Sequence, residues 1–267
     1  MAELRRLLMA PDRLRSGVPV LGLEADERHY LRRVLRLRPG DHLAVVDGQG
    51  HRWTAQLGEG GEQLDLQQPL EQPMETMAAP CPRLGLAVVG VRRGMDEVMR
   101  MACELGVDCI QPLRSQWRTS QAEDRPERWQ TILKEAVEQC ERLWMPELCS
   151  TLEAKDWWEK PGDGAFKALA TTRQQTLMGF DAFLEDAAAA SVSRQRVPDP
   201  VWIAIGPEAG WTPIEQRDAE RLGWTPVQLG GTILRTSTAA VAAATMLRSW
   251  RDRVQRSDPS TPSTHGV

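Results

Sequence analysis

Residues 201–211 read VWIAIGPEAGW, and residues 226–239 read PVQLGGTILRTSTA. Each stretch begins with a short apolar run that is typical of a buried parallel strand, and each continues into a glycine-bearing loop. Residues 212–215, TPIE, have the pattern of a capping box with proline at the first helical position, which predicts the start of a helix. Ligands bind outside the carboxyl ends of the strands in open α/β sheets, so the two loops predict a ligand site.

The rest of the chain from residue 84 onward repeats the same alternation of strand and helix. Short apolar runs predict strands at residues 84–89, 108–113, 166–170, 201–205 and 226–229. Helical spacing of apolar residues predicts helices at residues 94–105, 126–144, 180–190 and about 237–254. This rhythm indicates an α/β fold with a mostly parallel sheet.

The beginning of the chain has a different pattern, with two alternating runs at residues 42–46 and 51–57 around an Asp47-Gly48 turn. They predict a β-hairpin. A further strand is expected at residues 63–67, and a small β-barrel would close such strands. The expected domains are a β-barrel over residues 1–70, a proline-rich linker over 71–82, an α/β domain over 83–255, and a disordered Ser/Pro/Thr-rich tail over 256–267.

Composition places the chain among soluble globular proteins. It has 267 residues, of which 41% are hydrophobic and 26% are charged. The longest strongly apolar stretches, such as residues 239–247, are about half as long as a membrane span. The N-terminus carries no export signal, so we expect a cytoplasmic protein without a membrane segment. Five cysteines without a CxxC pair, far from the four histidines, predict reduced thiols and no metal site.

Basic residues are concentrated near the N-terminus, although the net charge is −4. Residues 1–39 hold nine arginines against five acidic residues. A locally basic surface suits contact with nucleic-acid phosphates. We therefore expect RNA to bind at Arg28, Arg32, Arg33 and Arg36; the alternative is a solvated arginine-rich helix.

The glycine spacing does not identify the ligand of the C-terminal loops. Gly206 and Gly210 are spaced GxxxG, as are Gly90 and Gly94, so neither pair completes a dinucleotide-binding fingerprint. A nicotinamide-dependent oxidoreductase is disfavoured for this reason, and the chain has no Walker A motif.

Four motifs in order closely resemble those of the SPOUT methyltransferases, in the branch that methylates N3 of a uridine in the decoding region of small-subunit rRNA. Residues 206–211, GPEAGW, are similar to that branch's GPEGGF, and residues 229–239 are similar to LG-x-x-ILR-T-E-TA. Residues 138–142, EQCER, are similar to EQSxR, and residues 104–112 to ELGV-x-x-I-x-P. The resemblance covers nearly the whole chain.

The resemblance implies a trefoil knot in the α/β domain, a bent S-adenosylmethionine within it, a homodimer, and an N-terminal PUA-like RNA-binding barrel. It implies methyl transfer to N3 of a uridine in 16S rRNA, free or within the small ribosomal subunit. The cofactor-lining residues that it implies are Ala170, Thr171, Thr172, Gly206, Pro207, Glu208, Gly210, Leu229, Gly230, Ile233, Leu234, Thr236, Thr238 and Ala239.

The same resemblance places Arg142 and Arg235 nearest the chemistry. The attacking uracil carries negative charge on O2 and O4, which a fixed guanidinium would stabilise. Glu208 is a candidate proton acceptor or a residue that only holds its loop. As alternatives, Arg142 could form an i,i+4 ion pair with Glu138, and Arg235 could bond backbone carbonyls.

Three residues depart from the family pattern. Ala209 replaces a glycine, which would cost about 1 kcal/mol if the position needs positive φ. Ser237 replaces a glutamate near Arg235 and the start of the last helix, and Cys140 replaces a serine. The changes at Ala209 and Ser237 favour one alternative, a non-catalytic RNA-binding or ribosome-assembly protein that keeps the fold. A second alternative is a SPOUT enzyme acting on a ribose 2′-hydroxyl, which the N-terminal barrel and the EQCER motif disfavour.

Tryptophan is unusually abundant, with ten residues beside three Phe and one Tyr. Trp117, Trp157, Trp158 and Trp211 are candidates for stacking on RNA bases. Most of them are expected in the core or at an interface. The small residues of the last helix permit a close helix approach, which favours the dimer.

Overall fold

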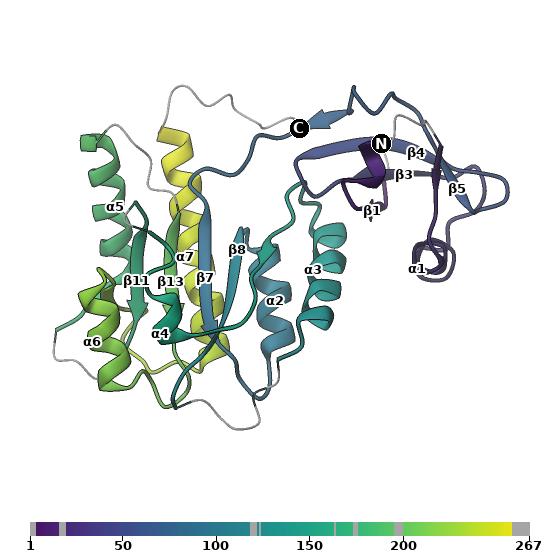
Figure 1. Cartoon of the computed structure of the whole chain (residues 1–267). Coiled ribbons are helices and arrows are strands. Elements are labelled where there is room, and N and C mark those ends of the chain that lie inside the picture. Colours follow the sequence, from purple (N-terminus) through teal and green to yellow (C-terminus); the bar gives the residue numbers. More distant parts are fainter. Residues whose placement is uncertain are drawn as a thin grey trace. The chain divides into compact units, whose positions relative to one another are not determined.

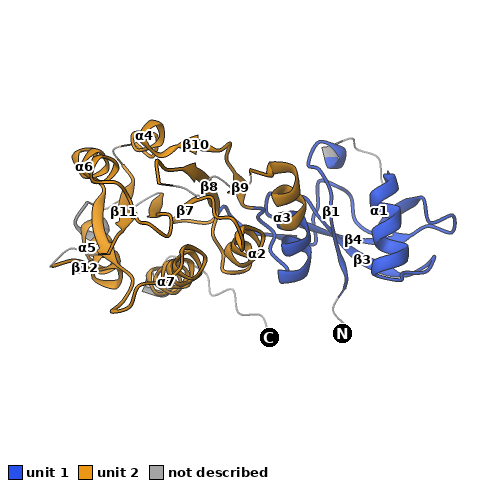
Figure 2. Ribbon diagram, turned by 90° about the horizontal axis from the view of Figure 1, so that it is seen from below, with its two compact units in different colours: residues 1–79, 133–145 blue, residues 80–132, 146–267 orange. Residues whose placement is uncertain are grey.

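The computed structural model describes residues 4–15, 20–117, 122, 124–162, 164–172, 176–194 and 200–257. It divides into two compact units, which Figure 2 colours separately. The first unit comprises residues 1–79 and 133–145, and the second comprises 80–132 and 146–267. Residues 133–145 thus group with the first unit, whereas the expected division placed them in the second domain. The tail at residues 258–267 lies outside the described residues.

The first unit is built on a six-stranded sheet with the order β1-β3-β4-β5-β2, in which β6 also pairs with β4. Strands β3 and β4 are antiparallel with Val46 opposite Arg52, which confirms the predicted hairpin. The two-residue strand β6 lies inside the segment expected to be a linker. The bounds are β1 (Arg6–Leu8), β2 (Val20–Gly22), β3 (His42–Val46), β4 (His51–Leu57), β5 (Gln63–Leu66) and β6 (Glu75–Thr76).

Three short helical segments accompany this sheet: η1 (Arg13–Arg15), α1 (Ala25–His29) and the π-helix η2 (Tyr30–Val34). The core of the unit forms where alternate strand residues meet the buried face of α1 and η2. Its members include Leu31, Leu43, Val45 and Leu64, none of which exposes any surface. Burying each such side chain contributes about 1.5–3 kcal/mol to folding of the unit.

The end of helix α3 (Pro126–Cys140) is fastened to the first strand of the unit. The backbone N–H of Leu8 donates to Oε1 of Glu138 over 2.8 Å, and the Tyr30 hydroxyl hydrogen-bonds the same carboxylate. Arg6 forms an ion pair with Glu141 at 3.0 Å. Glu141 has a φ of 63°, which ends the helix before the predicted residue 144.

Burial of Glu138 predicts a specific pH dependence of stability. Desolvation raises the pKa of this carboxyl above its ordinary 4.5, so the folded protein holds the proton more tightly than the unfolded chain. The free energy of unfolding therefore decreases as the pH rises from about 4.5 through the pKa of the folded state. Glu138→Gln keeps an oxygen acceptor for Leu8 but cannot titrate.

Urea unfolding at a series of pH values should show a flatter pH dependence for Glu138→Gln than for the wild-type protein. The matched control is Glu71→Gln, at an exposed position of the same unit, which should leave the dependence unchanged. An unchanged slope in Glu138→Gln would contradict the assignment.

The second unit contains a sheet in which every pairing is parallel, as predicted. Its order is β10-β8-β7-β13-β11-β14-β12, with β9 also paired with β8. Strand β13 lies between β7 and β11, so segments far apart in the sequence are neighbours (Figure 1). The bounds are β7 (Leu84–Val89), β8 (Cys109–Arg114), β9 (Glu147–Leu148), β10 (Leu152–Glu153), β11 (Phe166–Ala170), β12 (Met178–Gly179), β13 (Val201–Ile205) and β14 (Thr225–Gln228).

Helices cover both faces of this sheet, which confirms the α/β class (Figure 2). On one face, α7 contacts α2, α5, β7 and β13; on the other, α4 contacts α6. No helix in the described part of the chain is both long and apolar enough to cross a bilayer. The trefoil knot stays a prediction. The bounds are α2 (Met95–Glu104), α4 (Ala154–Trp157), α5 (Phe180–Arg194), α6 (Pro213–Arg221) and α7 (Thr236–Ser257).

Five tryptophans pack together on the face that α4 and α6 cover. Their neighbouring ring centroids lie 5.0–5.9 Å apart, and all five are at least nine-tenths buried. Gly85 of β7 lies against one of them, because an added Cβ would come within 2.2 Å of the Trp202 ring. The cluster consists of Trp157, Trp158, Trp202, Trp211 and Trp224. Trp157 and Trp158 are therefore core residues and not stacking platforms for RNA.

Candidate functional site

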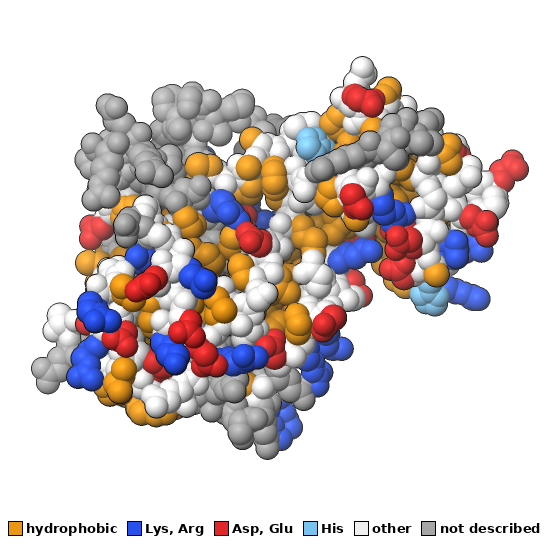
Figure 3. Space-filling model, in the orientation of Figure 1, with side chains coloured by type: hydrophobic (Ala, Val, Ile, Leu, Met, Phe, Trp, Pro, Cys, Tyr) orange, Lys and Arg blue, Asp and Glu red, His pale blue; other side chains and the backbone are white. Residues whose placement is uncertain are grey.

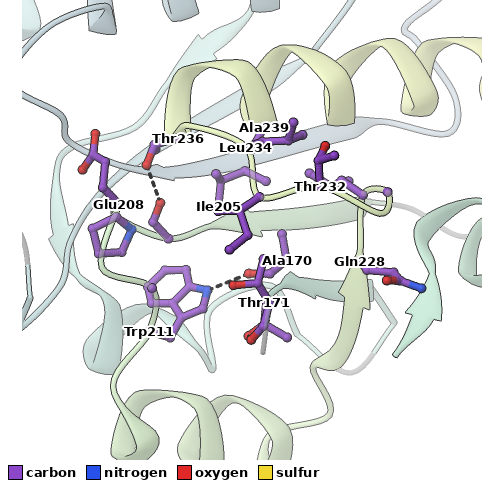
Figure 4. A pocket seen from close by; sticks show the side chains of 17 residues that line it. Ala170, Thr171, Ile205, Glu208, Trp211, Gln228, Thr232, Leu234, Thr236 and Ala239 are labelled. Atoms are coloured by element: carbon purple, nitrogen blue, oxygen red, sulfur yellow. Dashed lines mark hydrogen bonds between the residues drawn. The ribbon is translucent and has the colours of Figure 1, made fainter. Parts of the chain in front are cut away.

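A cavity lies at the carboxyl ends of β11, β13 and β14, where the first motif of the sequence predicted a ligand site (Figure 4). Three loops form its walls, one from each strand. The lining residues are Ala170, Thr171, Thr172, Ile205, Gly206, Pro207, Glu208, Gly210, Trp211, Gln228, Leu229, Gly230, Thr232, Ile233, Leu234, Thr236 and Ala239.

The loop after β13 turns sharply at Gly210, whose φ is 81°. The Gly210 N–H donates to the Pro207 carbonyl over 2.8 Å and closes the turn. The backbone of Ala209 does not adopt a positive φ. The left-handed conformation in this loop thus falls on Gly210, and Ala209 carries no backbone strain from a positive φ.

The loop after β14 lines the cavity with Leu229, Gly230, Thr232, Ile233 and Leu234. The amide groups of residues 230–234 donate no backbone hydrogen bond within the described chain. Gly230 has a φ of 149°, and an added Cβ there would meet no atom within 4 Å. A run of free amides beside a cavity can bind the polar edges of a planar ligand.

Two hydrogen bonds join the three loops, and both are drawn in Figure 4. The Thr236 hydroxyl at the start of α7 donates to the Gly206 carbonyl over 2.9 Å. The Trp211 indole N–H donates to the Ala170 carbonyl over 3.1 Å, and the Trp211 ring rests on Trp158. The cavity walls therefore hold one another in place.

The start of α6 fastens the loop after β13 to the loop after β8. The predicted capping box is present, because Glu215 accepts from the Thr212 N–H and the Thr212 hydroxyl accepts from the Glu215 N–H. Glu215 also accepts from the backbone N–H of Gln116 over 3.0 Å and from the Ser115 hydroxyl. This buried carboxylate fixes where the cavity loop ends.

The structure brings together thirteen of the fourteen residues expected to line a cofactor. The exception is Thr238, which is exposed in the first turn of α7 and does not line the cavity. Four lining residues were not expected: Ile205, Trp211, Gln228 and Thr232. Ile205 and Gln228 end their strands and Trp211 follows Gly210, so adjacency to the motifs could have indicated these three.

The candidate catalytic residues lie in different environments. Arg235 is exposed after β14, and its guanidinium has no hydrogen-bond or ion-pair partner among the described residues. It therefore does not bond backbone carbonyls of the described chain. Glu208 lines the cavity with an exposed side chain. Arg142 belongs to the first unit and follows Glu141, beyond the end of α3, so helical i,i+4 spacing from Glu138 does not apply.

The basic segment of the first unit forms α1 and η2 and not a single regular helix. Arg28 donates to the Leu23 carbonyl and Arg32 donates to the Gly60 carbonyl, so both guanidiniums have structural contacts. Arg33 and Arg36 are exposed and have no partner among the described residues. These two are free to bind an anion.

A second, polar cavity lies in the first unit around the EQCER motif. Glu138 and Arg6 in its wall bond Leu8 and Glu141, respectively, which gives this motif a structural role in the unit. Its lining residues are Leu4, Arg5, Arg6, Tyr30, Leu35, Glu138, Gln139, Cys140 and Glu141. Within the described chain, no three His, Cys, Asp or Glu side chains are grouped so that they could hold a metal ion.

Comparison with known proteins matches both units to families. The model of an RNA methyltransferase domain matches residues 79–248, which is more than half of the chain. The model of an RNA methyltransferase PUA domain matches residues 23–67.

Individual relatives match most of this chain. The chain is 34% identical over 250 residues to Ribosomal RNA small subunit methyltransferase E of Synechocystis, covering 91% of this chain and 77% of the relative. It is 25% identical to the protein of that name from Buchnera aphidicola (Schizaphis graminum), with coverages of 86% and 90%.

Among solved structures, the protein of that name from Neisseria gonorrhoeae, bound to S-adenosyl methionine, is 27% identical, with a TM-score of 0.74. The match covers 92% of this chain and 98% of the Neisseria chain. The chain therefore belongs to the RNA methyltransferase family, and residues 23–67 form its RNA methyltransferase PUA domain.

Proposed function

We propose that this protein transfers a methyl group from S-adenosylmethionine to N3 of a uridine in 16S rRNA. The observation that carries the proposal is the cavity at the carboxyl ends of β11, β13 and β14, in a member of this family. The relatives are named as methyltransferases of small-subunit rRNA, and the Neisseria structure holds S-adenosyl methionine. The choice of N3 rests on the four sequence motifs.

The residues of the cavity fit this methyl donor. Ile205, Leu234 and Ala239 supply apolar surface for the adenine ring, and the free amides of residues 230–234 suit its polar edge. The Glu208 carboxylate has the sign that favours a sulfonium cation. When bound there, S-adenosylmethionine supplies an electrophilic methyl group.

Arg235 is proposed to stabilise the reacting uracil. N3 loses its proton and forms a bond to the methyl carbon while the carbon–sulfur bond breaks, which leaves S-adenosylhomocysteine. Negative charge spreads to O2 and O4 as the proton leaves, and the Arg235 guanidinium, which has no partner among the described residues, can donate to either oxygen. Arg142 is proposed for the same role on the strength of the EQCER motif.

Glu208 is the proposed proton acceptor. It is a carboxylate of the cavity wall with an exposed side chain, so a bound base can reach it. The alternative role, holding the loop after β13, is less favoured, because the Gly210 turn and Trp211 already hold that loop.

The first unit is proposed to bind the RNA. Arg33 and Arg36 are the leading candidates for phosphate contacts, because Arg28 and Arg32 already donate to backbone carbonyls. We further propose a cytoplasmic homodimer that acts on the RNA free or within the small ribosomal subunit. The competing functions are 2′-O-ribose methylation and RNA binding without catalysis, and mapping the methylated atom separates all three.

The first prediction concerns the binding of S-adenosylhomocysteine. Gly230→Trp should weaken its affinity at least about 100-fold, because the large ring would fill the open space beside residue 230. Calorimetric titration measures this. Gly162→Trp is the control, because this exposed glycine of the second unit also has a positive φ, 72°, and an added Cβ there meets no atom within 4 Å. Equal affinities in both variants would contradict the location of the site.

The second prediction concerns Arg235. Arg235→Gln should lower kcat about 10²–10³-fold, because it removes a donor aimed at the developing charge. The affinity for S-adenosylhomocysteine should stay within about twofold, since Arg235 does not line the cavity. Single-turnover methylation of a decoding-region transcript measures the rate. A wild-type rate in the variant would exclude this role.

A further inference from the structure

The loop after β7 presents two adjacent arginines that no motif singled out. Arg92 and Arg93 are exposed, and neither guanidinium has a hydrogen-bond or ion-pair partner in the described chain. The loop itself is anchored on both sides. Val91 is buried with 4% of its surface exposed, and Gly94 adopts a φ of 95° directly before α2. The anchors fix the backbone while the two cations face solvent.

This loop adjoins the cavity of the second unit. Strand β7 pairs with β13 up to Val88 opposite Ile205, so the two strands end side by side. A Cβ built on Gly94 would lie 3.6 Å from the Cβ of Ser237. Ser237 follows Thr236, whose hydroxyl bonds the carbonyl of Gly206 in the cavity wall.

Several exposed arginines elsewhere on the second unit form ion pairs. Positive and negative side chains are interspersed over the face shown in Figure 3, and exposed arginines such as Arg100 and Arg248 pair with acids one turn away. Near the loop, the carboxylate of Asp96 pairs with Arg128 at 2.6 Å, while Glu97 is exposed. Arg92, Arg93 and Arg235 thus all lack a hydrogen-bond or ion-pair partner among the described residues, and all three follow strands of the sheet whose carboxyl ends form the cavity.

We infer that Arg92 and Arg93 bind phosphates of the RNA strand that flanks the target nucleotide. The inference rests on the proposed function, since it concerns the RNA of that reaction. Guanidinium groups bind phosphate oxygens through paired, charge-assisted hydrogen bonds. A phosphodiester held beside Ser237 would deliver the neighbouring base to the cavity. The two arginines are positioning residues: they hold the strand and do not touch the reacting atoms.

The experiment measures the affinity of the full-length protein for an in vitro transcript of the decoding region at several salt concentrations. Each phosphate contact contributes about 0.7–0.9 to the slope of log affinity against log salt. The double variant Arg92→Gln/Arg93→Gln should reduce the magnitude of the slope by about 1.4–1.8. In turnover assays, the KM for the transcript should rise about tenfold or more, with kcat at saturating RNA within about twofold.

The matched control is Arg248→Gln/Arg253→Gln, which removes the same charge from exposed positions of α7. Arg253 is seventeen residues beyond Thr236, about 25 Å along the helix from the cavity. The control should retain the wild-type slope. A wild-type slope in the Arg92/Arg93 variant, or an equal reduction in the control, would overturn the inference.

Failure of the inference and failure of the proposed function give different results. Titration with S-adenosylhomocysteine should give the same affinity for wild-type protein and the Arg92/Arg93 variant, because neither arginine lines the cavity. The proposed function fails if the wild-type protein does not bind S-adenosylhomocysteine and forms no methylated product. The salt dependence of RNA affinity still shows in that case whether the two arginines contact phosphate. A fall in kcat with an unchanged KM would also overturn the positioning role.

Discussion

The position of β13 is the constraint on which the rest of the second unit depends. This strand hydrogen-bonds to β7 on one side and to β11 on the other, and all five of its residues are buried. The position of its carboxyl end is therefore fixed by both neighbours. The loop that follows β13 must begin between the ends of two other strands. The Thr236 hydroxyl and the Trp211 indole then bond the loop to its neighbours. A binding site needs this rigidity, because the residues that line it must be held in place to meet a ligand.

Much of this fold could be predicted from local patterns, because long elements carry enough apolar residues to show a period. The hairpin around Asp47-Gly48 and the strand at residues 84–89 were found at their observed bounds. The two-residue strands β9, β10 and β12 could not be found, since two residues have no period. The end of α3 was also predicted wrongly. The positive φ of Glu141 ends the helix, whereas the helical spacing of apolar residues continues to Leu143.

The candidate site was predictable where it depends on glycine and proline and less so where it depends on side-chain direction. Gly206, Gly210 and Gly230 indicate turns by residue type alone, without a pattern of apolar residues. All three line the cavity. Thr238 was expected there only because it lies inside a motif; the helix that begins at Thr236 turns it to solvent. Arg92 and Arg93 were overlooked, because an exposed arginine pair has no sequence signature. Their environment becomes evident only when Gly94 is seen against Ser237.

The grouping of residues 133–145 with residues 1–79 has a consequence for synthesis of the chain. A domain that is continuous in sequence can fold as soon as its last residue leaves the ribosome. Here the first unit receives Glu138 and Glu141 from a segment that follows β8 of the second unit, and these residues bond Leu8 and Arg6. The N-terminal unit must therefore wait, with part of its contacts unmade, until residue 145 has been translated. A fragment ending at residue 79 would lack those contacts permanently.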